Sequence, residues 1–193
     1  AAPRLEATVV IVGGGPHALA VLSALHERSL AYMQLFSDPH GASGILSGIR
    51  KLSGLDLPDK VGSVIVVDPG ATFLEHWTAR FAALEINHLR SPAFAHPRAY
   101  EPQALVNYAV EHGRTNELLG TPFVTKRLAP VAGNMQEPLL YSLPTTALFA
   151  DFCASLGEEL PHQWVRGKAV EVLKDGGSNK LCVRFSRGDG GDG

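Results

Sequence analysis

The stretch VVIVGGGPHALA at residues 9–20 decides the fold, because it places three glycines directly between a strand pattern and a helix pattern. Residues 9–12 are four β-branched side chains in a row, which is typical of a buried strand. After the glycines, apolar residues recur at helical spacing: Ala18, Val21, Leu22 and Leu25. We therefore predict a first strand at about 8–12, a tight turn, and a helix at about 17–29.

The glycine turn matches a phosphate-binding pattern. Gly13, Gly15 and Ala18 satisfy G-x-G-x-x-[GA] directly after a strand and directly before a helix, which is the context that gives this pattern its meaning. The first glycine permits the sharp turn, the second lets the backbone approach a pyrophosphate, and the small third residue lets helix and strand pack closely. The anion would then lie on free N–H groups at the positive end of the helix.

An acidic residue follows the second predicted strand. The run VIVV at 64–67 ends in Asp68, which occupies the position where such folds hydrogen-bond the ribose hydroxyls. Asp68 comes later than the usual spacing of ~20 residues, and a surface insertion at 34–62, rich in Gly, Ser, Pro and Asp, explains the delay. The alternative is a plain strand-to-helix turn with Asp68 capping a loop. NAD, NADP and FAD all remain open, although a carboxylate at position 68 argues against NADP because it would repel a 2′-phosphate.

The rest of the chain predicts more helices and a hairpin. Thr72 and Glu75 form a capping-box pattern for a helix whose apolar stripe is Phe73, Trp77, Phe81 and Leu84. Further helices are expected at about 102–113 and 146–158, and two antiparallel strands at about 164–175 and 180–186. The second strand should lie at about 63–68, parallel and adjacent to the first. We predict one α/β, Rossmann-like domain over residues 1–193, with a parallel sheet, flanking helices and a small β-hairpin.

The bulk composition excludes several classes of protein. The 193 residues are 45% hydrophobic and 19% charged, with a formal net charge of −2, which gives no electrostatic reason to expect nucleic acid or an anionic membrane as a partner. Cys153 and Cys182 lie in apolar patterns that favour buried structural thiols. His88 and His96 have no Cys or carboxylate at ligand spacing, so we expect no metal site.

The motifs resemble those of a known class of flavoprotein. The segments GGGPHALAVLSAL at 13–25, VIVVDPGATFLEHWTARFAALEINHLRSPAFAHP at 64–97 and ALFADFCASL at 147–156 are similar to the N-terminal part of the two-dinucleotide-fold flavoproteins. The resemblance is to the flavin-dependent lysine or ornithine N-monooxygenases and related FAD/NAD(P)-binding proteins. It implies FAD as the cofactor, with NADPH used by the full-length protein.

The resemblance also implies a set of cofactor-binding residues. Gly13, Gly15, Pro16 and His17 would lie at the diphosphate, and Asp68 with Pro69 at the ribose. The other residues would lie near the flavin or the adenine: Trp77, Leu89, Arg90, Ser91 and Val170. Trp77 shares a helical stripe with Phe73 and Phe81, so a core position is the alternative for it, and a solvated loop is the alternative for Arg90 and Ser91. No catalytic residue is predicted.

The sequence offers no second strand–turn–helix with a glycine pattern, and the glycine-rich tail at 186–193 is followed by no helix. We therefore expect the FAD-binding portion of a flavin-dependent oxidoreductase, monooxygenase-like and NAD(P)H-dependent at full length, whose NADPH-binding domain belongs to another segment or a partner chain. The alternative is a non-catalytic FAD- or NAD-binding module acting as a subunit or regulatory partner. We expect a cytoplasmic protein, or an organellar one if a targeting peptide has been removed.

Overall fold

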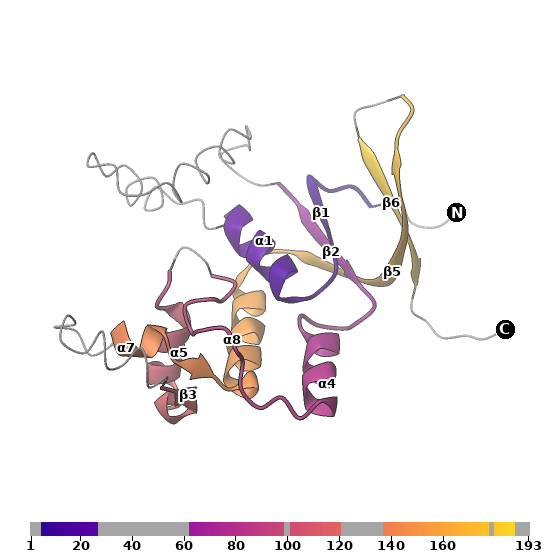
Figure 1. The fold of residues 1–193 in the computed structure, drawn as a ribbon. Helices are drawn as coiled ribbons and strands as arrows, with labels where there is room; N and C mark the ends of the chain where they lie inside the picture. Colours follow the sequence, from indigo (N-terminus) through magenta and orange to yellow (C-terminus); the bar gives the residue numbers. More distant parts are fainter. Residues whose placement is uncertain (1–4, 27–61, 99–100, 121–136, 178–179, 188–193) are drawn as a thin grey trace, which may run out of the picture.

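The computed structural model describes residues 5–26, 62–98, 101–120, 137–177 and 180–187. Its elements follow one another along the chain as shown in Figure 1. They are β1 (Val9–Val12), α1 (Pro16–His26), β2 (Val64–Asp68), α4 (Glu75–Ala83), α5 (Ala104–Glu111), the 3-10 helix η1 (Thr115–Glu117), β3 (Leu118–Leu119), α7 (Glu137–Leu140), β4 (Leu143–Pro144), α8 (Thr146–Glu159), β5 (Gln163–Lys174) and β6 (Leu181–Arg187).

The main sheet has the order β1-β2-β5-β6 and is mostly parallel. Strand β1 pairs parallel to β2, with Val12 beside Val67, and β2 pairs parallel to the first four residues of β5, with Asp68 beside Arg166. The predicted parallel and adjacent first and second strands are thus confirmed. β2 is an inner strand and all four of its apolar residues are buried, as is typical of a parallel sheet whose two faces are covered.

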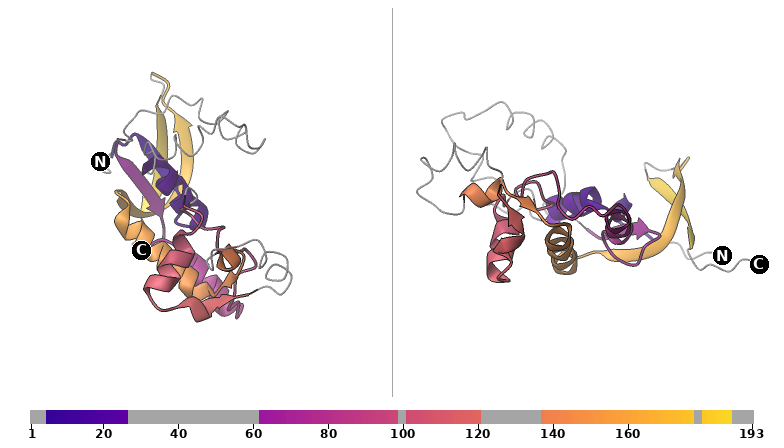
Figure 2. Two further views of the ribbon diagram at one scale, coloured as in Figure 1. Left: turned by 90° about the vertical axis from the view of Figure 1, so that its left-hand side faces the viewer. Right: turned by 60° about the horizontal axis from the view of Figure 1, so that its bottom comes forward.

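The second half of β5 leaves the parallel sheet and pairs antiparallel with β6, as predicted for the hairpin. The register shifts between Ala169 and Glu171, which marks a bulge a few residues after β5 has changed partner from β2 to β6. Figure 2 shows from two directions that this hairpin extends away from the helices. Several of its apolar side chains are therefore exposed, such as Val172 and Leu181.

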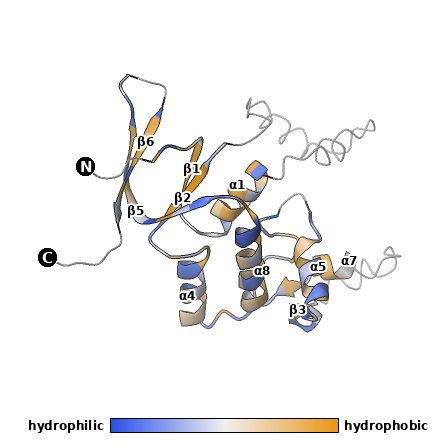
Figure 3. Cartoon of the chain, turned by 180° about the vertical axis from the view of Figure 1, so that it is seen from behind, coloured by the Kyte–Doolittle hydropathy of each residue, from blue (hydrophilic) through white to orange (hydrophobic). Residues whose placement is uncertain are grey.

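Helices α1 and α8 supply much of the core on one face of the sheet. Leu19 and Leu22 of α1 are fully buried together with Val66 of β2. Helix α8 contributes an inward stripe at helical spacing: Leu148, Phe149, Phe152, Cys153 and Leu156. Figure 3 shows the strands β1 and β2 as mainly hydrophobic and α8 as mixed, which is the pattern of an inner sheet covered by amphipathic helices. Burial raises the pKa of the Cys153 thiol, as expected for a structural cysteine.

A polar network fixes the start of α8. The hydroxyl oxygen of Thr145 accepts a hydrogen bond from the Leu148 N–H at 3.0 Å, which is an N-cap. The same hydroxyl donates to Glu117, and Arg114 binds Glu117 and Asp151 at the same time. Hydrogen bonds from Arg114 and Thr145 lower the pKa of the Glu117 carboxyl. The network holds the start of the helix predicted at 146–158, which is found at 146–159.

Two predictions about helix ends and faces are wrong in detail. Helix α4 begins at Glu75 after Leu74, whose φ of 62° is left-handed, and the Glu75 carboxylate accepts from the Ala71 N–H at 2.6 Å. No side chain caps this helix, so the expected Thr72–Glu75 capping box does not form. Leu84 follows the end of α4 and is 69% exposed, because the helix stops before it could turn inward.

Three smaller expectations also differ. In the helix predicted at 17–29, which is described at 16–26 and whose residues 27–29 lie outside the described residues, Val21 is exposed because the buried face passes through Leu19 and Ser23 instead. The helix predicted at 102–113 is the shorter α5. Cys182 is exposed, since β6 is an outer strand of the protruding hairpin. Of the predicted insertion at 34–62 only residue 62 is described, and most of the glycine-rich tail lies outside the described residues.

His96 is a buried histidine beside the ring of Phe152. Its Nε2 lies 3.3 Å from the carbonyl oxygen of Pro102, so this nitrogen carries the proton in the hydrogen bond. Burial lowers the pKa of His96 from 6.5 to about 4, and the Arg98 charge adds to the lowering, while backbone hydrogen bonds oppose it. The folded chain therefore holds His96 neutral at pH 7.

We expect the free energy of unfolding to fall as the pH drops from 6.5 to 4, by on the order of 3 kcal/mol from His96 alone. In this range the unfolded chain binds a proton on His96 that the folded chain does not, so protonation favours unfolding. Above pH 6.5 His96 is neutral in both the folded and the unfolded chain, so the full free energy of unfolding is retained there. Urea unfolding of the wild type and of His96→Phe at pH 7 and pH 4.5 measures it, because phenylalanine does not titrate. Equal losses of stability in the two proteins would contradict this assignment.

Candidate functional site: the glycine turn and Asp68

The glycine turn joins the end of β1 directly to the start of α1. Gly13 has a φ of 103°, a conformation that favours glycine, and its N–H donates to the carbonyl of Val67 at 2.9 Å. The chain therefore stays attached to β2 while it turns. Helix α1 begins three residues later at Pro16, where a missing N–H is harmless. The turn thus lies at the carboxyl ends of two parallel strands, where ligands bind in open α/β sheets.

The three glycines have different surroundings. A Cβ atom built on Gly13 or Gly15 would meet nothing within 4 Å. One built on Gly14 would lie 2.8 Å from Cη2 of Trp164 and 3.1 Å from Cγ of Asp68. The middle glycine is therefore packed against the protein, while the first and third border open space. They are the two glycines that the pattern requires, Gly13 for the sharp turn and Gly15 for the close approach of a pyrophosphate to the backbone.

Helix α1 presents its N-terminus to this open space. The N–H groups of a first helical turn have no carbonyl partner within the helix, and here they are those of His17 and Ala18. They lie beside Gly15, whose carbonyl accepts from the Leu19 N–H at 3.2 Å. The helix dipole adds positive potential at the same place. The turn and the helix start together have the chemistry of an anion cradle.

Asp68 ends β2 beside the glycine turn and is nearly buried, with 13% of its side chain exposed. Its Oδ2 accepts from the Gly14 N–H at 2.7 Å and its Oδ1 from the Gly70 N–H at 2.7 Å. The His76 ring nitrogen is 4.0 Å from Oδ1. An ionised carboxylate has about four acceptor positions, so two remain for hydroxyl groups of a ligand.

The sequence did not single out two residues of β5 that surround this carboxylate. The indole N–H of Trp164 donates to the Gly70 carbonyl at 2.9 Å, and Nε of Arg166 donates to the Pro69 carbonyl at 3.2 Å. Both residues lie on the part of β5 that pairs with β2. The sequence does place Trp164 and Arg166 two residues apart, and therefore on one face of a strand. Predicting that they lie near Asp68 also requires the register between β5 and β2.

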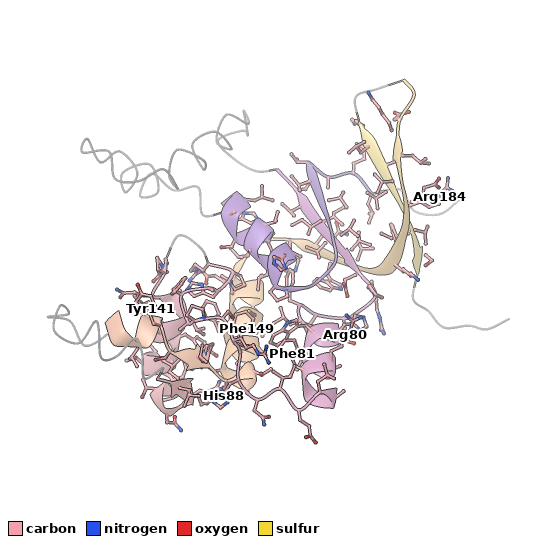
Figure 4. The ribbon with its side chains drawn as sticks, viewed as in Figure 1. Arg80, Phe81, His88, Tyr141, Phe149 and Arg184 are labelled. Carbon is pink, nitrogen blue, oxygen red and sulfur yellow. The ribbon has the colours of Figure 1, made fainter. Side chains whose placement is uncertain are left out.

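Trp77 lies in the aromatic core between α4 and α8. Its ring stacks on Phe81 with a centroid distance of 3.9 Å and tilts against Phe149 at 5.4 Å. Figure 4 shows Phe81 of α4 and Phe149 of α8 in the region between these two helices. The structure therefore places Trp77 in the core position that the helical stripe indicated.

The segment around Leu89 runs beside β4. The Leu89 N–H donates to the Pro144 carbonyl at 2.9 Å, and the Ala93 N–H donates to the Ser142 carbonyl at 2.8 Å. Leu89 is buried, Arg90 is exposed and Ser91 is half-buried. These contacts attach the segment to the lobe formed by α5, α7 and α8, and Figure 4 shows Tyr141 and His88 in that lobe. The Leu89 and Ala93 amides are thus bonded to this lobe and not to the glycine turn.

Val170 lies on β5 at the bulge, beyond the four residues that pair with β2, and is 56% exposed. The structure thus brings together six of the predicted residues: Gly13, Gly15, Pro16, His17, Asp68 and Pro69. The remaining five lie on other elements: Trp77, Leu89, Arg90, Ser91 and Val170. Which of these five contact a bound cofactor stays a prediction.

In the part of the chain that the structure describes, no group of three or more His, Cys, Asp or Glu side chains is placed to hold a metal ion. None of the helices that the structure describes is long and apolar enough to cross a membrane.

Comparison with known proteins gives a similarity of fold. No protein-family model matches the sequence, and no curated protein matches it. Among solved structures, the chain is similar to DfoA from Erwinia amylovora, the FAD-bound cadaverine monooxygenase of desferrioxamine biosynthesis, with a TM-score of 0.49 and 14% identity. The match covers 98% of this chain and 33% of DfoA, so the chain spans about a third of the length of that protein.

Proposed function

We propose that this chain binds FAD through its adenosine diphosphate half, as the FAD-binding portion of a flavin-dependent oxidoreductase. The observation that carries the proposal is the meeting of the glycine turn and Asp68 at the tips of two neighbouring parallel strands, with the Gly14 N–H bonded to Asp68 at 2.7 Å. This is the arrangement in which a Rossmann-like fold holds a diphosphate and its adenosine ribose.

The residues present fit the group. The open space at Gly13 and Gly15 would admit a diphosphate, and the N–H groups of Gly15 and His17 are placed to donate to it. The two remaining acceptor positions of Asp68 would take the ribose hydroxyls. Bound flavin supplies hydride and electron transfer, while this chain binds and orients it.

A more specific proposal concerns the activity of the whole protein to which this chain belongs. We propose a monooxygenase-like, NAD(P)H-dependent enzyme whose NADPH-binding part belongs to another segment or to a partner chain. It is supported by the similarity of the segments at 13–25 and 64–97 to those of N-hydroxylating flavoproteins. Nothing in the described part of the chain favours the alternative of a non-catalytic module.

A calorimetric titration with FAD, ADP, FMN and NADP tests the proposal. We expect FAD and ADP to bind, because they share the diphosphate and the adenosine ribose. FMN lacks the adenosine half and should bind at least about tenfold more weakly. NADP carries a 2′-phosphate that Asp68 repels, so we expect NADP to bind more weakly than FAD. Arg166 is the nearby cation that could bind such a phosphate if this expectation is wrong. Binding of FMN without binding of ADP would overturn the proposal, and preference for NADP would overturn the choice of FAD.

A further inference from the structure

Trp164 lies on the third strand of the sheet, yet its side chain reaches the glycine turn that follows the first. Its partner in the register is Val66 of β2, and Val66 is in turn beside Ile11 of β1. The indole extends along the sheet to Gly14, where a Cβ atom would be only 2.8 Å from Cη2. The ring of Phe73 meets Trp164 edge-on at 4.9 Å. The indole therefore packs against Phe73 as well as against the glycine turn.

The same indole also links the loop after β2 to the glycine turn. Its N–H donates to the Gly70 carbonyl at 2.9 Å, and the Gly70 N–H donates to Asp68 at 2.7 Å. The other oxygen of Asp68 accepts from Gly14, against which the indole packs. Two loops that are more than fifty residues apart in the sequence are therefore joined by one carboxylate and one indole.

Gly14 is held on both of its backbone groups. Its N–H is bonded to Asp68, and its carbonyl accepts from the Leu74 N–H at 2.7 Å. The bond to Asp68 holds the Gly13–Gly14 peptide, and the bond from Leu74 holds the Gly14–Gly15 peptide. Because the Gly15 N–H lies in the same plane as the Gly14 carbonyl and points the opposite way, the second bond sets the direction of the Gly15 N–H. Donors that are already aimed at the position of an anion lose less freedom when it binds.

We infer that Trp164 is a positioning residue for the diphosphate cradle, acting through Gly14 and Gly70 and not by touching the ligand. This inference rests on the proposed function, because it assigns a role to Trp164 in the same site. The packed side of the glycine turn then contributes to binding together with the open side. The sequence pattern for such turns leaves the position of Gly14 unspecified.

The test deletes the indole N–H without changing the shape of the ring. Replacement of Trp164 by 3-benzothienylalanine, in which sulfur takes the place of N–H, is compared with Trp164→Phe and with Tyr108→Phe as a control. Tyr108→Phe also removes one donor from a half-buried aromatic, but Tyr108 packs against His112 and Phe152, away from the turn. The wild type and each variant, all as the 193-residue chain, are titrated with ADP. Hydrogen exchange of the Gly14 and Gly70 amides is followed by NMR without ligand.

We expect the benzothienyl variant to bind ADP about fivefold more weakly, which is the effect of one lost hydrogen bond. Its Gly14 and Gly70 amides should exchange faster than in the wild type, while amides of α5 such as Leu105 should not change. Wild-type ADP affinity in both Trp164 variants would overturn the inference and leave the proposed function standing. Failure of the wild type to bind either ADP or FAD would overturn the proposed function and the inference with it.

Discussion

Gly15→Ala is expected to abolish detectable FAD binding and to leave the fold intact. A methyl group at position 15 would meet no protein atom within 4 Å, and Gly15 is not among the described glycines with a left-handed φ. The free energy of unfolding should therefore be unchanged or should rise by about 0.5 kcal/mol, because alanine restricts the unfolded chain. The same methyl group would occupy the space that the diphosphate needs. We expect a loss of affinity of at least about a hundredfold, or roughly 3 kcal/mol.

Gly14→Ala is the matched control, one residue away in the same turn. Its methyl group would press on Trp164 and Asp68, so it should destabilise the fold by about 1–3 kcal/mol. Urea unfolding and FAD titration of both variants separate the two effects. Wild-type FAD affinity in Gly15→Ala would show that the diphosphate does not lie on this turn. Equal destabilisation by the two substitutions would show that Gly15 is packed like Gly14.

The local part of this site could be predicted from the sequence, because it depends on neighbours along the chain. The strand, the glycines and the helix lie within twenty residues, and each follows from backbone preference and apolar spacing. The adjacency of β1 and β2 follows from the general rules for such units. Once the second strand is placed beside the first, the end of that strand predicts that Asp68 lies next to the glycine turn.

The other part could not be predicted, because it depends on which strands lie side by side. Trp164 is 150 residues from Gly14, and only the register of β5 with β2 brings it to the turn. The pattern G-x-G-x-x-[GA] includes Gly13 and Gly15 and leaves the residue between them unspecified, so the packing of Gly14 could not be predicted. The start of α4 was missed for a similar reason. Leu74 adopts a left-handed φ because its N–H is bonded to the Gly14 carbonyl, a contact between distant segments.

Asp68→Ala is expected to weaken both the fold and FAD binding. Removing the carboxylate leaves the N–H groups of Gly14 and Gly70 without their acceptor, which should lower the free energy of unfolding by about 1–3 kcal/mol. FAD loses its ribose partner and also meets a less ordered turn. We expect FAD affinity to fall by on the order of 1.5–3 kcal/mol, the range for a hydrogen bond to a charged group.

NADP separates the two roles of Asp68, because for this ligand the loss of order and the loss of charge act in opposite directions. Removing the carboxylate relieves its repulsion of the 2′-phosphate, and Arg166 stays in place on β5. The ratio of FAD to NADP affinity should therefore fall in Asp68→Ala, whereas a merely disordered turn would weaken both ligands equally and leave the ratio unchanged. Asp68→Asn is the control that removes the charge and keeps one carbonyl acceptor, so it should lower the ratio with a smaller loss of stability. Titration of the three proteins with both dinucleotides measures the ratio, and urea unfolding measures the stability. An unchanged ratio in both variants, with FAD and NADP weakened equally, would mean that Asp68 only holds the loops together and that the ribose is recognised elsewhere.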